Sequence, residues 1–203
     1  MKRIFGLVIF VTIGISLLGQ VKENENYIDS VSAKIIGLKE SLVKIQEGYY
    51  AILTPGEAGN IGAFISEDGI ILIDDQWSPL SNKIKELLST ITNKPIAYII
   101  NTHYHYDHTN GNLYFGQEKI PIVSHQNARQ RMSEKQVLLT TLEWQGSAGI
   151  VQQSYPDYAL PSITFADKMI FSLSLLAVMN NFSAMQRIVF VIQRSQGHEQ
   201  KEN

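Results

Sequence analysis

The sequence contains no cysteine, which excludes disulfide bonds and thiolate metal ligands. It also lacks a basic surplus, because 17 Lys and Arg stand against 19 Asp and Glu, for a net charge of −2. This balance argues against binding to nucleic acid or to an anionic membrane. No apolar run reaches the roughly 20 residues that a membrane-spanning helix needs. With 44% hydrophobic residues among 203, the composition is that of one ordinary globular domain.

Residues 1–19 have the form of a secretory signal peptide. Lys2 and Arg3 give a charged start, residues 4–18 form a short apolar run, and polar residues follow Gly19. We predict that residues 1–19 are removed and that the protein is exported to the periplasm or outside the cell, with no stable membrane insertion afterwards. A retained N-terminal anchor is the alternative. A lipid anchor at that point is excluded, because no cysteine follows Gly19.

After a lead-in at residues 20–41, alternating and continuous apolar runs over residues 42–168 predict an α/β domain. Asp68-Gly69 lies between two apolar runs and indicates a hairpin. The run at 70–73 is unbroken, which is typical of a strand buried on both faces. The expected strands are at 42–45, 49–53, 61–65, 70–73, 96–100 and 120–123.

Helices are expected between the later strands. Ser78 is predicted to cap a helix that has Pro79 at its first position and one apolar stripe along its length. Because this helix joins two strands, those strands should be parallel with a right-handed crossover. A short helix is expected at 113–115 and a longer one from 125 to 142.

Three of the five histidines lie between Asn101 and Asn112, in the pattern His103-x-His105-x-Asp107-His108. Imidazole nitrogen and carboxylate oxygen are ligands that zinc takes. Alternate side chains of an extended loop point the same way, so His103 and His105 can converge on one ion. A bend can turn Asp107 and His108 toward a second ion. The alternative is a polar, aromatic-rich loop that binds nothing, but packing does not explain three clustered imidazoles.

At this motif the chain resembles the metallo-β-lactamase fold hydrolases, which share His-x-His-x-Asp-His after a buried strand. The resemblance runs from Leu42 to Lys168 and includes the segments 59–62, 71–75 and 122–125. It implies an αβ/βα sandwich with the metals at one edge. This chain would supply the N-terminal half and part of the linker to the second half.

The resemblance also implies residue roles. His103, His105, Asp107 and His108 would bind one or two zinc ions, and Asp107 would be the catalytic residue that holds or deprotonates water. Asp74 would be a buried structural acid rather than a ligand. From its place at a strand end, Asp74 either orients ligand histidines or caps loop amides. The capping role is favoured for its neighbour Asp75.

The motif alone provides two ligands for each ion, whereas a catalytic zinc keeps about three. The resemblance implies a later histidine, a bridging aspartate and a final histidine beyond Lys168. After His108 the chain contains only two more histidines and two more aspartates: His125, His198, Asp157 and Asp167. His125 is expected to be structural, and His198 lies in a polar tail. We therefore expect the chain to be diverted or truncated near residue 169, with a divergent tail at 169–203.

Two functions follow from these observations. The first is a zinc-dependent hydrolase that uses a metal-activated water on a small-molecule ester, thioester, β-lactam or related bond. The alternative is a truncated or frameshifted, non-catalytic remnant with weak or no metal binding. A di-iron oxidoreductase of the same fold is less favoured, since that branch has Glu where this chain has His105. Trp144 either contacts substrate or packs its loop.

Overall fold

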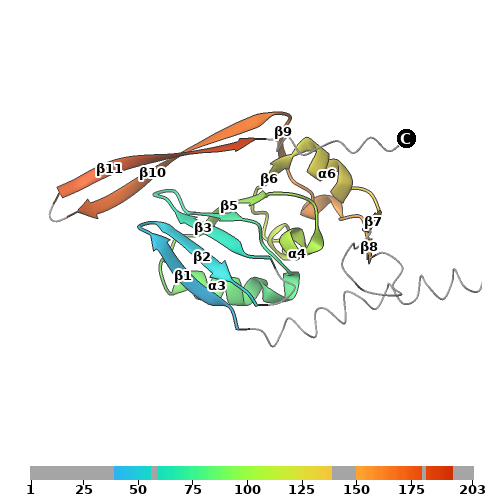
Figure 1. Ribbon diagram of the computed structural model, residues 1–203, viewed down its shortest axis with the longest axis horizontal. Helices are drawn as coiled ribbons and strands as arrows, with labels where there is room; N and C mark the ends of the chain where they lie inside the picture. The colour runs from blue at the N-terminus through green and yellow to red at the C-terminus, as the bar shows by residue number, and fades with distance from the viewer. Residues whose placement is uncertain (1–38, 56–58, 139–149, 180–181, 194–203) are drawn as a thin grey trace, which may run out of the picture.

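The structure is a computed structural model that describes residues 39–55, 59–138, 150–179 and 182–193. Its centre is a seven-stranded mixed sheet in the order β1-β2-β3-β4-β5-β6-β9 (Figure 1). The α/β fold class predicted from the sequence is confirmed. The strands are β1 (Ser41–Gln46), β2 (Tyr49–Leu53), β3 (Ile61–Ile65), β4 (Ile70–Ile73), β5 (Ile96–Asn101), β6 (Ile122–His125) and β9 (Ile163–Phe165).

The sheet changes direction at β4. Strands β1 to β4 pair antiparallel, and β5, β6 and β9 then add in parallel. The predicted hairpin joins β3 to β4, and Gly69 adopts a φ of 148° that side chains rarely tolerate. The predicted parallel pair is β4 and β5, joined through a helix. Parallel strands bring their carboxyl ends to one edge, so the ends of β4 and β5 are neighbours there.

The helical segments are short and pack with one face of the sheet. They are η1 (Ser78–Leu80), α3 (Ser81–Ser89), α4 (Tyr106–Thr109), α5 (Asn112–Phe115), α6 (Gln126–Met132) and η2 (Asp157–Ala159). The main core contains Ile84 and Leu88 of α3 and Phe115 of α5, together with Leu72 of β4. A smaller cluster on the opposite face contains Ile71 of the same strand. The unbroken run in β4 is thus buried on both sides, as predicted.

Two predicted helix boundaries are wrong. Trp77, not Ser78, is the residue that precedes the first helical turn, and its side chain makes no capping hydrogen bond. The Ser78 amide instead donates to Asn110 Oδ1 at 3.0 Å, a contact from a distant segment. The second error concerns α6, which ends at Met132 rather than continuing to residue 142. Strand β7 (Gln136–Leu138) follows it and pairs with β8 (Ile150–Gln152), so tertiary pairing overrides local helix propensity. Residues 139–142 lie outside the described residues.

The segment after β9 forms a separate two-stranded ribbon. Strands β10 (Lys168–Met179) and β11 (Phe182–Gln193) pair antiparallel along their whole length. Figure 1 shows this ribbon extending away from the seven-stranded sheet. The expected domain boundaries at residues 19, 41 and 168 stay predictions.

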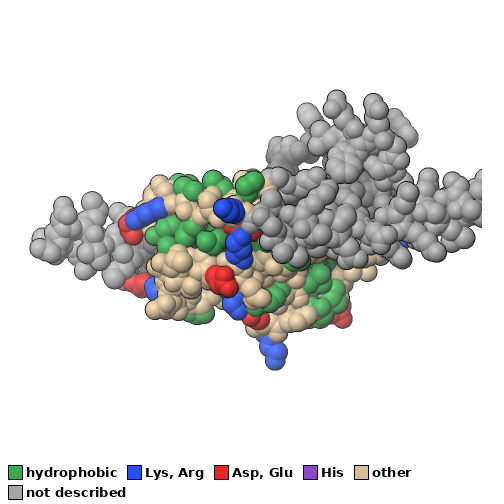
Figure 2. All heavy atoms as spheres, turned by 90° about the horizontal axis from the view of Figure 1, so that it is seen from below, with side chains coloured by type: hydrophobic (Ala, Val, Ile, Leu, Met, Phe, Trp, Pro, Cys, Tyr) green, Lys and Arg blue, Asp and Glu red, His purple; other side chains and the backbone are tan. Residues whose placement is uncertain are grey.

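The surface seen in Figure 2 mixes Lys and Arg with Asp, Glu and hydrophobic side chains, so this view shows no broad patch of one charge sign. That pattern agrees with the small net charge of the chain. Within the described ranges, no helix has both the length and the apolar character that a membrane span requires.

Candidate metal centre

The buried strand β5 delivers the chain into the histidine loop. Its last residue, Asn101, is 2% exposed, and its Oδ1 accepts a hydrogen bond of 3.0 Å from Asn112 Nδ2. The loop then leads into α4. His105, the residue directly before this helix, has an extended backbone. His103 and His105 therefore lie on the extended loop, while Asp107 and His108 lie on the helical turn. This bend is the one that the motif spacing requires.

The three imidazoles of the motif gather at one place. The ring centroid of His103 is 4.7 Å from that of His105 and 4.3 Å from that of His108. Asp107 Oδ2 lies 3.2 Å from His108 Nε2, and all four side chains are half-buried. All four predicted metal residues thus lie in one small cluster. The motif predicts one pair of ligands for each of two ions, His103 with His105 and Asp107 with His108. In the structure His103 lies beside His108 as well as beside His105, so the two pairs are not separated in space.

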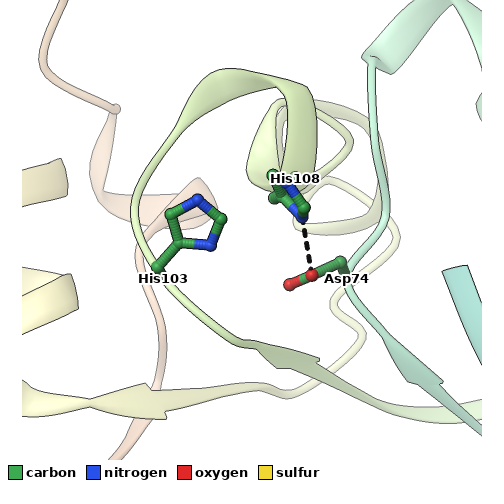
Figure 3. A group of neighbouring side chains, drawn as sticks. All are labelled: Asp74, His103 and His108. Atoms are coloured by element: carbon green, nitrogen blue, oxygen red, sulfur yellow. Dashed lines mark hydrogen bonds and ion pairs between the residues drawn. The ribbon is translucent and has the colours of Figure 1, made fainter. Parts of the chain in front are cut away.

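Asp74 joins this cluster from the end of β4. Figure 3 shows the side chains of His103 and His108 facing a common space, with Asp74 at one side. Asp74 Oδ2 lies 2.8 Å from His108 Nδ1, so the carboxylate accepts from that ring nitrogen. One potential ligand atom from each of these three residues lies within 4.8 Å of the others, so the three together can also hold a metal ion.

Thr102 is a site residue that the sequence analysis missed. Its amide donates to Asp74 Oδ1 and its hydroxyl donates to Asp74 Oδ2, both at 2.8 Å. The same hydroxyl lies 3.0 Å from His103 Nδ1. Asp74 therefore contacts His108 directly and His103 through Thr102. The signal was available in part, because Thr102 immediately precedes the first histidine of the motif.

The ionisable side chains of the cluster shift one another's pKa values. Hydrogen bonds with Asp107 and with Asp74 raise the pKa of His108 to about 10, against the effect of burial. Burial and the neighbouring histidines lower the pKa of His103, and burial lowers that of His105. Although burial acts to raise the pKa of Asp107, the hydrogen bond from His108 holds it below its ordinary value. His103 and His105 are thus neutral near pH 7, which is the state that metal binding needs, whereas His108 is protonated and would have to lose a proton to bind an ion.

The donor set fits a zinc ion. Zinc–ligand bonds to His and Asp are about 2.0–2.2 Å long, so neighbouring ligands on a tetrahedral ion lie roughly 3.3 Å apart. Among the described residues, the group that offers three neighbouring ligand atoms is Asp74, His103 and His108, whose atoms all lie within 4.8 Å of one another. His108 Nε2 and Asp107 Oδ2, 3.2 Å apart, form an ion pair beside this group. His108 Nδ1 faces Asp74 and Nε2 faces Asp107, so an ion bound at Nε2 would have to replace the proton between this nitrogen and Asp107.

Asp75 behaves differently from Asp74. It is fully buried, and its pKa lies well above the ordinary value, chiefly because of burial and secondly because of the nearby charge of Asp74. Its main-chain amide donates to the His108 carbonyl at 2.9 Å, and its side chain lies against Gly111. Asp75 therefore packs beneath the histidine loop and does not reach the imidazole cluster in the described structure.

Of the remaining sequence candidates, His125 is described and does not join the centre. His125 Nδ1 accepts from the Asn127 amide at 3.1 Å, and its Nε2 lies 2.7 Å from the Ala166 carbonyl oxygen. Both nitrogens are thus occupied at the start of α6, in agreement with the expected structural role. Trp144 and His198 lie outside the described residues.

A family model for the metallo-beta-lactamase superfamily matches residues 54–165, which is more than half of the chain. The chain belongs to the metallo-beta-lactamase superfamily. The match includes Asp74 and the whole His103–His108 motif. The resemblance inferred from the motif is therefore confirmed.

Solved metallo-beta-lactamases share part of the fold. FIM-1 from Pseudomonas aeruginosa, in its mono-zinc form, is 21% identical over 45% of this chain and 44% of its own, with a TM-score of 0.42. The enzyme from Pontibacter korlensis is 16% identical over 66% of this chain and 56% of its own, with a TM-score of 0.47. A B3 enzyme with an active-site glutamic acid is 13% identical over 80% of this chain and 65% of its own, with a TM-score of 0.49. The chain thus spans about half to two thirds of these proteins.

Proposed function

We propose that the protein is a zinc-dependent hydrolase that acts on a small-molecule ester, thioester, β-lactam or related bond. The observation that carries this proposal is the convergence of three imidazoles and the Asp107 carboxylate at the end of the buried strand β5. A rigid strand end is a good support for ligands, because metal binding tolerates little displacement. Superfamily membership is consistent with the same chemistry.

The residues would divide the work as follows. His103 and His105 would hold one zinc ion, and Asp107 and His108 would hold a second. When bound, zinc lowers the pKa of a water molecule to near 7 and polarises the bond to be cleaved. Asp107 remains ionised because its pKa is below the ordinary value, so its carboxylate can hold the water through a hydrogen bond, and it would take the proton once zinc has made that water more acidic. Asp74 accepts the Nδ1 proton of His108 and so fixes the orientation of this ring, while Nε2 faces Asp107 and would bind the ion after it loses its proton.

One observation favours the second candidate, a remnant that binds metal weakly and does not catalyse. His125 has both ring nitrogens engaged by backbone groups, so it cannot complete the ligand set as it stands. Asp157 and Asp167 are both exposed and belong to no metal-type cluster in the described residues. On this view the motif keeps its shape, but no histidine or aspartate after His108 in the described part of the chain provides a third ligand for either ion.

A substrate panel with added zinc distinguishes the two candidates. Esters, thioesters and β-lactams are tested on the full chain, on Asp107→Ala and on His125→Ala at equal folded fraction. We expect any zinc-dependent activity to disappear with Asp107→Ala, at a cost of several kcal/mol in transition-state stabilisation, and to survive His125→Ala. Activity that follows the opposite pattern would place the site on other residues. No turnover of any substrate at saturating zinc would favour the remnant.

A further inference from the structure

Gln76 occupies a conformation that glutamine rarely adopts. Its φ is 57°, in the left-handed region, and its side chain is completely buried. A left-handed conformation is unfavourable for a non-glycine residue, and such strain persists where the surroundings enforce it. Burial of a primary amide adds a further cost unless its polar atoms are paired. Gln76 must therefore make contacts that a less strained residue would not.

The backbone of Gln76 lies directly under the histidine loop. Its amide donates to the His108 carbonyl at 3.3 Å, and its carbonyl accepts from the Gly111 amide at 2.7 Å. Gln76 also forms an isolated parallel bridge with Thr109. Because these contacts use only main-chain atoms, they explain the backbone position and not the choice of glutamine.

The side chain of Gln76 ties together the two ends of the β2–β3 connection. Its Nε2 donates to Thr54 Oγ1 at 2.9 Å, just after β2. The same Nε2 donates to the carbonyl of Gly59, just before β3. Thr54 is 6% exposed, so this contact is shielded from water. Two residues on opposite ends of one connection are thus held by a single buried amide.

Gly59 is the point at which this connection touches the metal centre. Its amide donates to the Asp107 carbonyl at 3.2 Å. A Cβ on Gly59 would lie 2.8 Å from His108 Cε1 and 3.0 Å from His108 Nδ1, so the Gly59 backbone packs against the edge of that ring. Gly59 therefore packs against the same edge of the His108 ring that hydrogen-bonds to Asp74.

We propose that Gln76 is a positioning residue for the metal centre. Its side-chain amide holds Gly59 against His108, so that the imidazole keeps the orientation set by Asp74. This inference rests on the proposed metal-dependent function, but the contact itself can be tested without catalysis. Residues of an outer shell typically change metal affinity by about 10- to 100-fold when they are replaced.

The test uses two variants that accept the backbone conformation and remove the bridge. Gln76→Gly relieves the left-handed strain, and Gln76→Asn keeps an amide on a residue that tolerates this region but is one methylene shorter. Lys119→Gly is the matched control, because Lys119 has a φ of 61° and lies outside the centre. Each full-length variant is measured for zinc affinity by chelator competition, for hydrogen exchange at the Gly59 amide, and for thermal stability.

We expect both Gln76 variants to lose about tenfold in zinc affinity and to exchange the Gly59 amide faster, while Lys119→Gly changes neither. Unchanged zinc affinity and unchanged Gly59 protection in a folded Gln76→Gly or Gln76→Asn protein would overturn the inference. If the wild type itself binds no zinc, the proposed function fails, and Gly59 exchange alone then decides the positioning role. A loss of zinc affinity equal to that of Lys119→Gly would also contradict it, since relief of strain alone would explain the change.

Discussion

Asp74 Oδ2 and His108 Nδ1 lie 2.8 Å apart, although 34 positions separate them in the chain. The contact exists because β4 and β5 are parallel neighbours, which brings the residue that ends β4 beside the loop that follows β5. Asp74 adopts a φ of 63°, so the chain turns sharply at this point and directs the carboxylate to the histidine loop. Strand pairing and the turn at Asp74 together place this carboxylate so that it orients His108, a predicted ligand.

Replacement of Asp74 by Asn should weaken zinc binding by about 10- to 100-fold. Asn tolerates the left-handed backbone and still offers an oxygen to the Thr102 amide, but it loses the negative charge that holds the His108 Nδ1 proton. Chelator competition measures the effect, and Asp157→Asn, an exposed substitution in η2, is the control. Equal zinc affinity in the wild type and Asp74→Asn would show that this carboxylate does not support the centre.

Zinc should be retained poorly by the unmodified chain. The motif provides two ligands for each ion where a catalytic site keeps three, so we expect less than about one equivalent per chain after dialysis. Metal analysis of the dialysed protein gives the stoichiometry. One or two retained equivalents that are lost when His103 and His105 are both changed to Ala would refute this deficiency and favour the hydrolase.

Gly111→Ala should destabilise the fold by about 1–3 kcal/mol, the usual cost of overpacking. A Cβ at this position would lie 2.7 Å from Asp75 Cγ and would also meet the Asp75 carbonyl. The backbone of Gly111 has a φ of −58°, so lack of space and not backbone strain is the cause. Urea unfolding measures the change.

Gly62→Ala is the control for this substitution, since its new Cβ would be no closer than 3.3 Å to its neighbours. We expect a smaller loss of stability there. Comparable losses at both glycines would mean that the space beside Asp75 is not the deciding factor.

His125→Ala should lower the free energy of unfolding by about 1–2 kcal/mol, the scale of a lost helix cap, without changing zinc affinity. The Ala variant removes the acceptor for the Asn127 amide at the start of α6. His125→Asn is a matched variant that can still cap the helix and should recover part of the loss. A large fall in zinc affinity with His125→Ala at equal folded fraction would indicate that this histidine reaches the metal.

Export is a prediction that the described residues do not test, because residues 1–19 lie outside them. We expect the mature protein to begin after Gly19 and to be found outside the cytoplasm. N-terminal sequencing of the protein from its producing cell measures this directly. A cytoplasmic protein that still begins at Met1 would contradict it.

Local patterns were sufficient for the first six strands, β1 to β6, and insufficient for the later strands β7 to β11 and for the helix ends. Strands β3 and β4 follow from apolar runs around Asp68-Gly69, since the turn and the runs are contiguous. The end of α6 depends on pairing between β7 and β8, which are separated in sequence. A helical pattern past Met132 contains no signal for that partner, so the predicted helix was too long.

The sequence by itself determined the superfamily and indicated the candidate metal residues, because His103, His105, Asp107 and His108 lie within six positions and their chemistry is local. Only the tertiary structure decided how these side chains are held. Thr102, which follows β5, contacts Asp74 at the end of β4, and Gln76 after β4 contacts Gly59 before β3, and no spacing rule links these residues. The physical reason is that hydrogen bonds act over about 3 Å in space, whereas a sequence motif records only neighbours along the chain.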